Sequence, residues 1–310
     1  MNIEERIDPE YADGLAARPV NDLRDIPAAR RTFLARFDPA PARPGVRSSY
    51  HVTTSYDDAE VRLRVFQPVD PEPQAPCLYW IAGGGYVLPN PDFDEQWCTD
   101  RVERHGCTVV SVEWRRAPEH CFPAAAEDIY AGLRWTFAHT ESLGINPSRV
   151  AVGGMSSGGG SAAALALLVR DRGEMSICHQ LLVYPMLDDT NTMPSTYRVT
   201  DDRLWHRDAN ELAWRAYLGD MYGTDDVSPY AAPARMKDLT NLAPATILTG
   251  ELDLFVDENI VYAQRLMAAG VPVELHVYAR VTHGFQRMNP TAGTTLQFFV
   301  DLDRALERAF

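Results

Sequence analysis

Short apolar runs of strand length alternate with helical stretches over most of this 310-residue chain. Cys77–Ala82 and Cys107–Trp114 are almost entirely apolar and rich in β-branched and aromatic residues, which predicts strands buried on both faces. Five further strands are expected at Arg62–Phe66, Val150–Val152, Gln180–Tyr184, Thr246–Thr249 and Val273–Tyr278. Helices are expected at about Glu95–His105, Ala124–His139, Ser157–Arg172, Val256–Ala269 and Thr294–Arg308. This alternation predicts an α/β fold, in which a mostly parallel sheet carries helices on both faces and active residues gather beyond the carboxyl ends of the strands.

Two regions break this alternation. Residues 1–47 are rich in Pro, Ala, Asp and Arg, and predict short helices with irregular connections. Residues 187–245 contain helical stretches but no clear strand. We expect these two regions, called the cap segments below, to cover the active edge of a core formed by residues 48–186 and 246–310. Four aromatic residues of the second segment either line a pocket or pack inside the cap: Trp205, Trp214, Tyr217 and Tyr222.

The charge and cysteine content narrow the range of partners. With 29 basic and 43 acidic residues the net charge is −14, which disfavours nucleic acid and anionic membranes as partners. No cysteine lies in a CxxC or CxxxH spacing, so we expect free thiols and neither a metal site nor a disulfide framework. The N-terminus resembles no signal peptide, and no apolar run suits a membrane span. These features predict a soluble, cytoplasmic protein. The cysteines are Cys77, Cys98, Cys107, Cys121 and Cys178.

The most specific motif is GMSSG at Gly154–Gly158, which follows the predicted strand RVAV and opens the helix SAAALALLVR. This strand–turn–helix setting is typical of a nucleophile elbow, in which a strained turn exposes the serine above the sheet. The alternative, a phosphate-binding turn, requires GxGxxG or GxxxxGK[ST], and neither is present. Ser156 is therefore the predicted nucleophile, and Ser157 is expected to contribute its amide rather than its hydroxyl.

A serine nucleophile needs a base, and eight histidines are available. His283 lies in VTHGFQR, between the last predicted strand and the last helix, and is the predicted base. His120, in the loop RRAPEHCFP, is its best rival, whereas His276 lies inside a strand and is expected to pack in the core. The other histidines considered lie on or beside predicted helices: His105, His139 and His206.

The acid that orients the base is expected between the nucleophile and the base in the chain. Asp253 and the pair Asp188-Asp189 both follow predicted strands there. We favour Asp253, because neighbouring strand ends then bring acid and base together. Glu251, Asp257 and Glu258 are close in sequence, and are expected to begin the next helix, where acidic side chains suit the helix dipole.

Three consecutive glycines follow the predicted strand CLYWIA. Glycine leaves backbone amides accessible, and such amides stabilise the oxyanion formed when a serine attacks an ester. We expect Gly84, Gly85 and Ser157 to donate to the oxyanion, and Gly83 to shape the turn. The alternative is a tight connection that carries no chemistry.

Taken in order, AGGGY, SVEWRRAPEHCFP, VGGMSSGG, LLVYP, SPYAAP, ELDLFVDE and THGF resemble the hormone-sensitive-lipase family of α/β-hydrolases over roughly residues 60–300. This resemblance implies an eight-stranded sheet with a helical cap, the triad Ser156, Asp253 and His283, and no metal or cofactor. LWHRDANELAWRAYLG and SPYAAPARMKDLTNLAP are also similar to a bacterial member that removes acetyl groups from an alkaloid.

Three positions depart from the pattern of that family. Ala82 stands where the family has a histidine before the glycines, and that histidine ties the glycine loop in place through hydrogen bonds that alanine cannot make. Met155 replaces the usual Asp before the nucleophile. The acid is followed by Leu254-Phe255 instead of Pro-Leu.

These observations predict a serine carboxylesterase that hydrolyses short-chain, acetyl-like esters of a bulky or aromatic alcohol through an acyl-enzyme. One alternative is a biosynthetic enzyme that uses the same triad for lactone hydrolysis, acyl transfer or elimination. Another is a non-catalytic receptor for a small ligand. The expected partner is a small-molecule ester, and a homodimer through an edge strand or the C-terminal helix is a further expectation.

Overall fold

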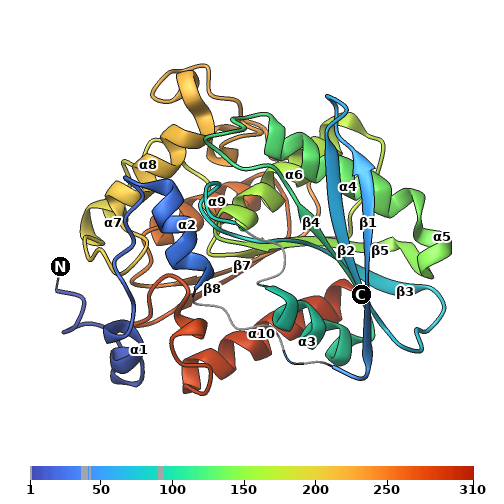
Figure 1. Ribbon diagram of the computed structural model, residues 1–310, viewed down its shortest axis with the longest axis horizontal. Coiled ribbons are helices and arrows are strands. Elements are labelled where there is room, and N and C mark those ends of the chain that lie inside the picture. Colours follow the sequence, from blue (N-terminus) through green and yellow to red (C-terminus); the bar gives the residue numbers. More distant parts are fainter. Residues whose placement is uncertain (1, 36–40, 42, 90–93) are drawn as a thin grey trace.

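A computed structural model describes residues 2–35, 41, 43–89 and 94–310, and its centre is an eight-stranded sheet (Figure 1). The strand order is β1-β2-β4-β3-β5-β6-β7-β8. All strands from β3 to β8 run parallel to one another, whereas β2 is antiparallel to both of its neighbours, β1 and β4. The predicted α/β fold with a mostly parallel sheet is therefore confirmed. The strands are β1 Val46–Thr54, β2 Glu60–Pro68, β3 Ala75–Ile81, β4 Thr108–Glu113, β5 Ile145–Met155, β6 His179–Val183, β7 Ala245–Gly250 and β8 Val273–Tyr278.

Helices cover both faces of the sheet. In Figure 1, α3 and α10 lie on one side of the strands, and α4, α6 and α9 lie on the other. Each of these five helices was predicted to within two residues. Their bounds, together with the short α5, are α3 Glu95–His105, α4 Ala124–Ala138, α5 Thr140–Leu143, α6 Ser157–Arg172, α9 Val256–Ala268 and α10 Gly293–Ala309.

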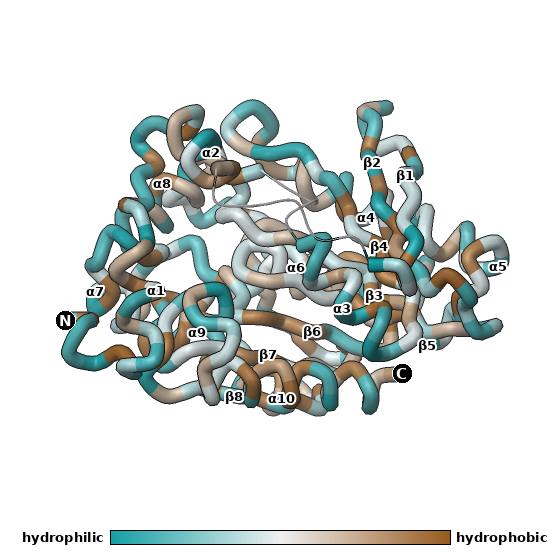
Figure 2. The backbone as a smooth tube through the Cα atoms, turned by 60° about the horizontal axis from the view of Figure 1, so that its bottom comes forward, coloured by the Kyte–Doolittle hydropathy of each residue, from teal (hydrophilic) through white to brown (hydrophobic). Residues whose placement is uncertain are grey.

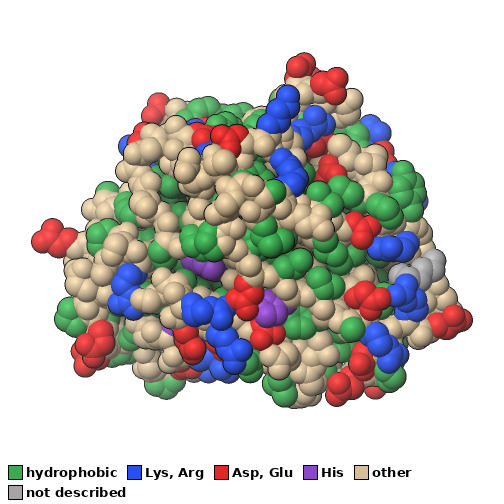
Figure 3. Space-filling model, turned by 180° about the vertical axis from the view of Figure 1, so that it is seen from behind, with side chains coloured by type: hydrophobic (Ala, Val, Ile, Leu, Met, Phe, Trp, Pro, Cys, Tyr) green, Lys and Arg blue, Asp and Glu red, His purple; other side chains and the backbone are tan. Residues whose placement is uncertain are grey.

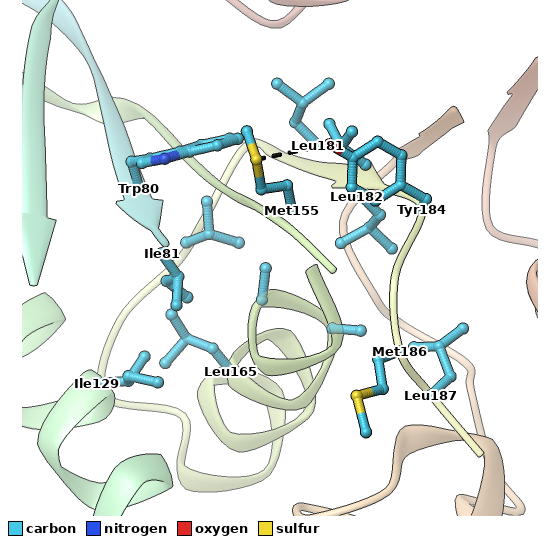
Figure 4. Packing of buried hydrophobic residues seen from close by; sticks show 14 of the residues in the cluster. Trp80, Ile81, Ile129, Met155, Leu165, Leu181, Leu182, Tyr184, Met186 and Leu187 are labelled. Carbon is cyan, nitrogen blue, oxygen red and sulfur yellow. Dashed lines mark hydrogen bonds between the residues drawn. The ribbon is translucent and has the colours of Figure 1, made fainter. Parts of the chain in front are cut away.

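The core lies between the central strands and these helices. Every residue of β3, β6 and β7 is buried, and most of the residues in these strands are apolar. Figure 2 shows hydrophobic residues concentrated on β6 and β7 and hydrophilic residues on the peripheral turns. In Figure 4, Ile81 of β3 lies close to Leu165 of α6, where the sheet and this helix pack together.

The structure differs from the sequence prediction at the two edges of the sheet. β1 was not predicted, because its sequence VRSSYHVTT lies at an edge where every side chain is exposed or half-buried. At the opposite edge, His276 of β8 is half-buried and contacts the Glu274 carboxylate at 2.8 Å, so its predicted place in the core is wrong. Edge strands lack the apolar pattern from which buried strands are recognised.

The cap segments lie side by side at one end of the molecule (Figure 1). The backbone amide of Asn21 in the first segment donates to the backbone carbonyl of Asp202 in the second at 2.7 Å. Part of the first segment (residues 1, 36–40 and 42) lies outside the described residues. The helices of the two segments are η1 Pro9–Tyr11, α1 Ala12–Ala16, α2 Ile26–Leu34, α7 Pro194–Arg198, α8 Arg207–Leu218, η3 Gly219–Met221 and η4 Pro233–Arg235.

Acidic and basic side chains are interspersed over the face shown in Figure 3, without one large area of a single sign. Across the part of the chain that the structure describes, every helix is too short or too polar to cross a membrane.

Candidate active site

The turn between β5 and α6 holds Ser156 in a strained conformation, with φ 60° and ψ −125°. Such angles are costly for a residue with a side chain and persist only where the surroundings impose them. The two flanking glycines show how they are imposed. A Cβ atom on Gly154 would lie 2.3 Å from the Gly158 carbonyl oxygen, and one on Gly158 would lie 2.1 Å from the Ile81 carbonyl oxygen. Only glycine therefore lets the strand and the helix approach closely enough to form this turn.

The structure brings the predicted nucleophile, base and acid into one chain of hydrogen bonds. His283 Nε2 lies 3.0 Å from Ser156 Oγ, and His283 Nδ1 lies 2.8 Å from Asp253 Oδ2. Asp253 follows β7 and His283 follows β8, so parallel neighbouring strands deliver both residues to the same edge of the sheet. The exposed fraction is 8% for Ser156, 13% for the His283 side chain and 1% for Asp253. The serine is thus reachable from a pocket, while the carboxylate is closed off from water.

Backbone contacts fix the two loops that carry the acid and the base. The Leu252 amide donates to the Val281 carbonyl at 3.0 Å and joins the two loops. The Phe255 amide donates to Asp253 Oδ1 at 2.9 Å, which leaves Oδ2 directed at His283. The imidazole ring also contacts the rings of Tyr184 and Phe255 edge-on, at centroid distances of 4.4 and 5.3 Å. The His283 ring is therefore held in orientation from several sides.

The three glycines after β3 run beside the nucleophile. A Cβ atom on Gly83 would lie 2.6 Å from the Met155 carbonyl oxygen and 3.2 Å from Ser156 Cβ, so this glycine packs directly against the elbow. Gly84 and Gly85 both have positive φ, at 127° and 57°. Among the described residues, no group accepts a hydrogen bond from the amide of Gly84 or Gly85. These amides have the availability that an oxyanion donor requires.

Ser157 begins α6, so its amide is among the first four of the helix, which have no acceptor within it. Its hydroxyl is buried and makes no hydrogen bond to a described residue. Both facts fit the expectation that the backbone of Ser157, rather than its side chain, contributes to the site. Ala82 is 4% exposed and lines the pocket beside the glycines, where its methyl group offers no hydrogen bond.

Contacts from distant parts of the chain hold the segment that follows the glycines. Arg30 of α2 donates to the Val87 carbonyl at 2.8 Å, and Arg116 donates to the Leu88 carbonyl at 2.9 Å. Burial lowers the pKa of Arg116 to about 10, so this guanidinium remains charged at neutral pH. The ring of Tyr86 stacks on Tyr217 of α8, with centroids 3.8 Å apart and planes 2° from parallel.

A pocket opens onto Ser156 and His283, and the space between its lining residues, part of it open to solvent, amounts to about 790 Å³. Several lining residues were not predicted from the sequence. Five of those named below come from the cap segments, and local sequence gives no signal of how these segments pack on the core. The unpredicted lining residues include Arg18, Asn21, Phe33, Leu88, Asp94, Tyr184, Arg203, Leu204 and Arg287.

The four aromatic residues of the second cap segment divide between the two roles that the sequence left open. Trp205 lines the pocket. Trp214 and Tyr217 are 0% and 2% exposed and belong to the core, and Tyr222 is half-buried against it. The pocket wall from this segment therefore includes a tryptophan, while the other three rings mainly support the packing.

The rival candidates lie outside the pocket. His120 does not line it, and neither Asp188 nor Asp189 does. Asp189 forms an ion pair with Arg235 at 2.7 Å, and Asp188 accepts from the Thr190 amide at 2.9 Å. These contacts give both aspartates a structural role.

Met155, one of the departures from the family pattern, has polar neighbours. Its sulfur accepts from the Tyr184 hydroxyl at 3.6 Å, the contact drawn as a dashed line in Figure 4, and from Arg287 at 3.3 Å. Arg287 also pairs at 2.6 Å with the buried Asp94, which accepts from Trp80 Nε1 at 2.9 Å. This network connects the loop after His283 to the pocket wall beside the nucleophile.

No group of three or more His, Cys, Asp or Glu side chains in the described ranges is arranged to hold a metal ion. All five cysteines are free thiols, and three of them are buried.

Comparisons with known proteins agree with this geometry. A family model described as alpha/beta hydrolase fold matches residues 78–287. A solved structure titled Bacterial Heroin Esterase superimposes with a TM-score of 0.95 at 39% identity, covering 98% of each chain. Esterase LipI of Mycobacterium tuberculosis is 36% identical over 68% of this chain and 66% of its own length. Ethyl acetate hydrolase of Pseudomonas putida is 33% identical over 76% of this chain and 74% of its own.

The chain therefore belongs to the α/β-hydrolase family, in its hormone-sensitive-lipase branch of carboxylic ester hydrolases.

Proposed function

We propose that this protein is a serine carboxylesterase that cleaves short-chain esters of a bulky or aromatic alcohol through an acyl-enzyme. The observation that carries the proposal is the chain of contacts from Ser156 through His283 to Asp253, beside a pocket. The glycine loop lines this pocket with amides for which no described residue is the acceptor. Six of the lining residues come from the cap segments, which are proposed to shape the pocket for the substrate.

In the first half of the reaction, Ser156 Oγ attacks the ester carbonyl carbon while its proton passes to His283 Nε2. The 2.8 Å contact with Asp253 keeps the Nδ1 proton in place and stabilises the imidazolium that forms. The carbonyl oxygen becomes an oxyanion, to which the amides of Gly84, Gly85 and Ser157 donate. The C–O bond to the alcohol then breaks, and the alcohol leaves with the proton from His283. The acyl group remains on Ser156.

In the second half, water replaces the alcohol. His283 accepts a proton from the water as its oxygen attacks the acyl carbon, and returns a proton to Ser156 Oγ as the carboxylic acid departs. The same donors stabilise the second oxyanion. Besides the substrate and this water molecule, each step uses only residues of this chain.

The chemistry of the pocket and the names of two relatives support the substrate class. Phe33, Leu88, Leu204 and Trp205 give the wall an apolar surface that suits an aromatic or otherwise bulky alcohol. An ethyl acetate hydrolase and an arylesterase are both among the relatives, at 33% and 30% identity. An ester with an acetyl-sized acyl group and an aryl leaving group would combine the substrate features in the names of these two relatives.

Purified protein should be tested on p-nitrophenyl esters of increasing acyl length and on acetates of larger aromatic alcohols. We expect the highest kcat/KM for acetyl and propionyl esters. Ser156→Ala and His283→Ala should each lose nearly all turnover, whereas His120→Ala, which changes the rival histidine outside the pocket, should keep it. Absence of hydrolysis of every ester, or activity that survives Ser156→Ala, would refute the proposal. Product analysis with added alcohols will show whether water is the preferred acyl acceptor.

A further inference from the structure

The indole ring of Trp205 lies directly on Gly85. A Cβ atom on Gly85 would lie 2.1 Å from Trp205 Cη2, 2.6 Å from Cζ2 and 3.1 Å from Cζ3. The three nearest atoms to that position all belong to this one ring, so the ring occupies the space where a side chain would otherwise stand. Gly85 follows Gly84 in the loop, and the peptide between them carries the Gly85 amide that is proposed to donate to the oxyanion.

Trp205 is itself held firmly. It is 7% exposed, and its Nε1 donates to Asn210 Oδ1 of α8 at 3.0 Å. Asn210 in turn donates to Asn191 Oδ1 at 3.1 Å, and both asparagines are buried. A hydrogen-bonded chain inside the second cap segment therefore fixes the direction of the ring.

The glycine loop has little local structure of its own. Its internal hydrogen bonds run from the Val87 and Leu88 amides to the Gly84 carbonyl, at 3.1 and 2.8 Å. Glycines sample many backbone conformations, and both Gly84 and Gly85 adopt positive φ. Contacts from outside the loop must therefore select the conformation in which their amides face Ser156.

We propose that Trp205 is a positioning residue, whose ring presses on Gly85 and orients the Gly84 and Gly85 amides toward the oxyanion. This inference rests on the proposed esterase function. Under this proposal, the second cap segment helps to stabilise the oxyanion in addition to lining the substrate pocket. Removing the ring should therefore lower kcat, whereas a residue that only lined the pocket would change KM.

A double-mutant cycle tests this contact, with p-nitrophenyl acetate as a small substrate. Gly85→Ala should lower kcat by about 100-fold or more, the typical effect of losing one oxyanion donor. Trp205→Ala should lower kcat by about 10- to 100-fold with little change in KM. The double variant should be no slower than the slower single variant, because the added methyl group then has room. Effects that multiply would overturn the proposal, since residues in direct contact are not additive.

A second readout separates positioning from stability. An aryl trifluoromethyl ketone adds reversibly to the serine and leaves an oxyanion, so its affinity should fall by the same factor as kcat/KM in Trp205→Ala. The matched control is Trp135→Ala, which removes a tryptophan that is 9% exposed on α4 and does not line the pocket. It should lower the melting temperature but leave kcat and the affinity for the ketone within about twofold of wild type. Equal losses in both variants would overturn the proposal.

Trp205→Phe covers the case in which Trp205→Ala does not fold. It keeps an aromatic ring in the cap and removes the bond to Asn210, so we expect kcat between the wild-type and Trp205→Ala values. A kcat equal to wild type together with a raised KM would mean that the residue acts only as a pocket wall. If the wild-type protein hydrolyses no ester, the proposed function itself fails. If wild type is active and Trp205→Ala is equally fast, only this inference fails.

Discussion

Two glycine-containing turns meet at Ser156, and they depend on glycine for different reasons. In the elbow, the atoms nearest to a Cβ on Gly154 or Gly158 are backbone atoms of the sheet and of α6. In the loop after β3, the atoms nearest to a Cβ on Gly85 belong to a side chain of the second cap segment. The elbow is therefore set by packing of the core, while Gly85 in the loop is confined by a distant part of the chain. One catalytic centre thus combines a rigid half and a half that depends on side chains.

The largest loss of kcat among these predictions is expected for Asp253→Asn. This variant also tests whether the core holds the loop that carries His283 when the Asp253 carboxylate is removed. The asparagine NH₂ group would face His283 Nδ1, so the imidazole proton would shift to Nε2, which could then not accept from Ser156. We expect kcat to fall by a factor on the order of 10⁴. The melting temperature should stay close to that of wild type, because the Leu252–Val281 backbone bond remains. Unfolding measured by circular dichroism checks this, and a large loss of stability would show that the carboxylate itself holds the loop.

Gly158→Ala tests the rigid half directly. Its Cβ would stand 2.1 Å from the Ile81 carbonyl oxygen, so β3 and α6 must separate. We expect about 3 kcal/mol of destabilisation, at the upper end of typical overpacking, and a loss of most activity. The control is Gly173→Ala, where φ is 65° but open space surrounds the Cβ position. It should cost about 1 kcal/mol from backbone strain alone and keep full turnover. Denaturant titrations of both variants, with activity assays, decide the point.

Ala82→His tests the glycine loop, the half of the site that we propose side chains to orient. If side chains orient the glycine loop, a new polar group beside it should restore part of the kcat lost in Trp205→Ala, by about three- to tenfold. In wild type the same change should alter turnover more than the melting temperature, since position 82 lines the pocket. Ala82→Leu adds similar bulk without hydrogen bonds and should restore nothing. Equal rescue by leucine would mean that filling space is what matters.

The smallest effect concerns Glu258, whose carboxylate accepts from the Leu187 amide at 2.7 Å where β6 leads into the second cap segment. Burial, and then the neighbouring Asp188, raise the pKa of Glu258 well above its usual value. The folded state therefore binds a proton that the unfolded state releases, and stability falls as pH rises above about 4.5, the ordinary glutamate pKa.

Glu258→Gln removes this dependence, because the amide resembles the protonated acid and keeps the oxygen that accepts. We expect the variant to match wild type near pH 5 and to melt a few degrees higher near pH 8, without a change in kcat. Thermal melts at the two pH values measure it. A variant less stable than wild type at pH 8 would contradict the assignment.

The rigid half could be predicted from sequence, and the other half only in part. Ser156, Asp253 and His283 come after the carboxyl ends of β5, β7 and β8, and the parallel sheet brings these ends to one edge. The Gly-Gly-Gly run showed that amides are exposed, but not what orients them.

Trp205, Arg30 and Arg116 reach the loop from three separate regions, and nothing in the local sequence around any of them indicates that contact. The unpredicted β1 has a related cause. Its stability comes from pairing with β2 at an exposed edge, which leaves no apolar pattern in the sequence.

The packing of Trp205 on Gly85 has a consequence for engineering. Libraries aimed at a new substrate would naturally vary the cap segments, because they supply much of the pocket wall. In this protein, substitutions in the cap segments would also change kcat. A variant can therefore bind the desired ester and still hydrolyse it too slowly. Designers who exchange cap segments between relatives should therefore transfer Trp205 together with Asn210 and Asn191, as one unit with the glycine loop that it contacts.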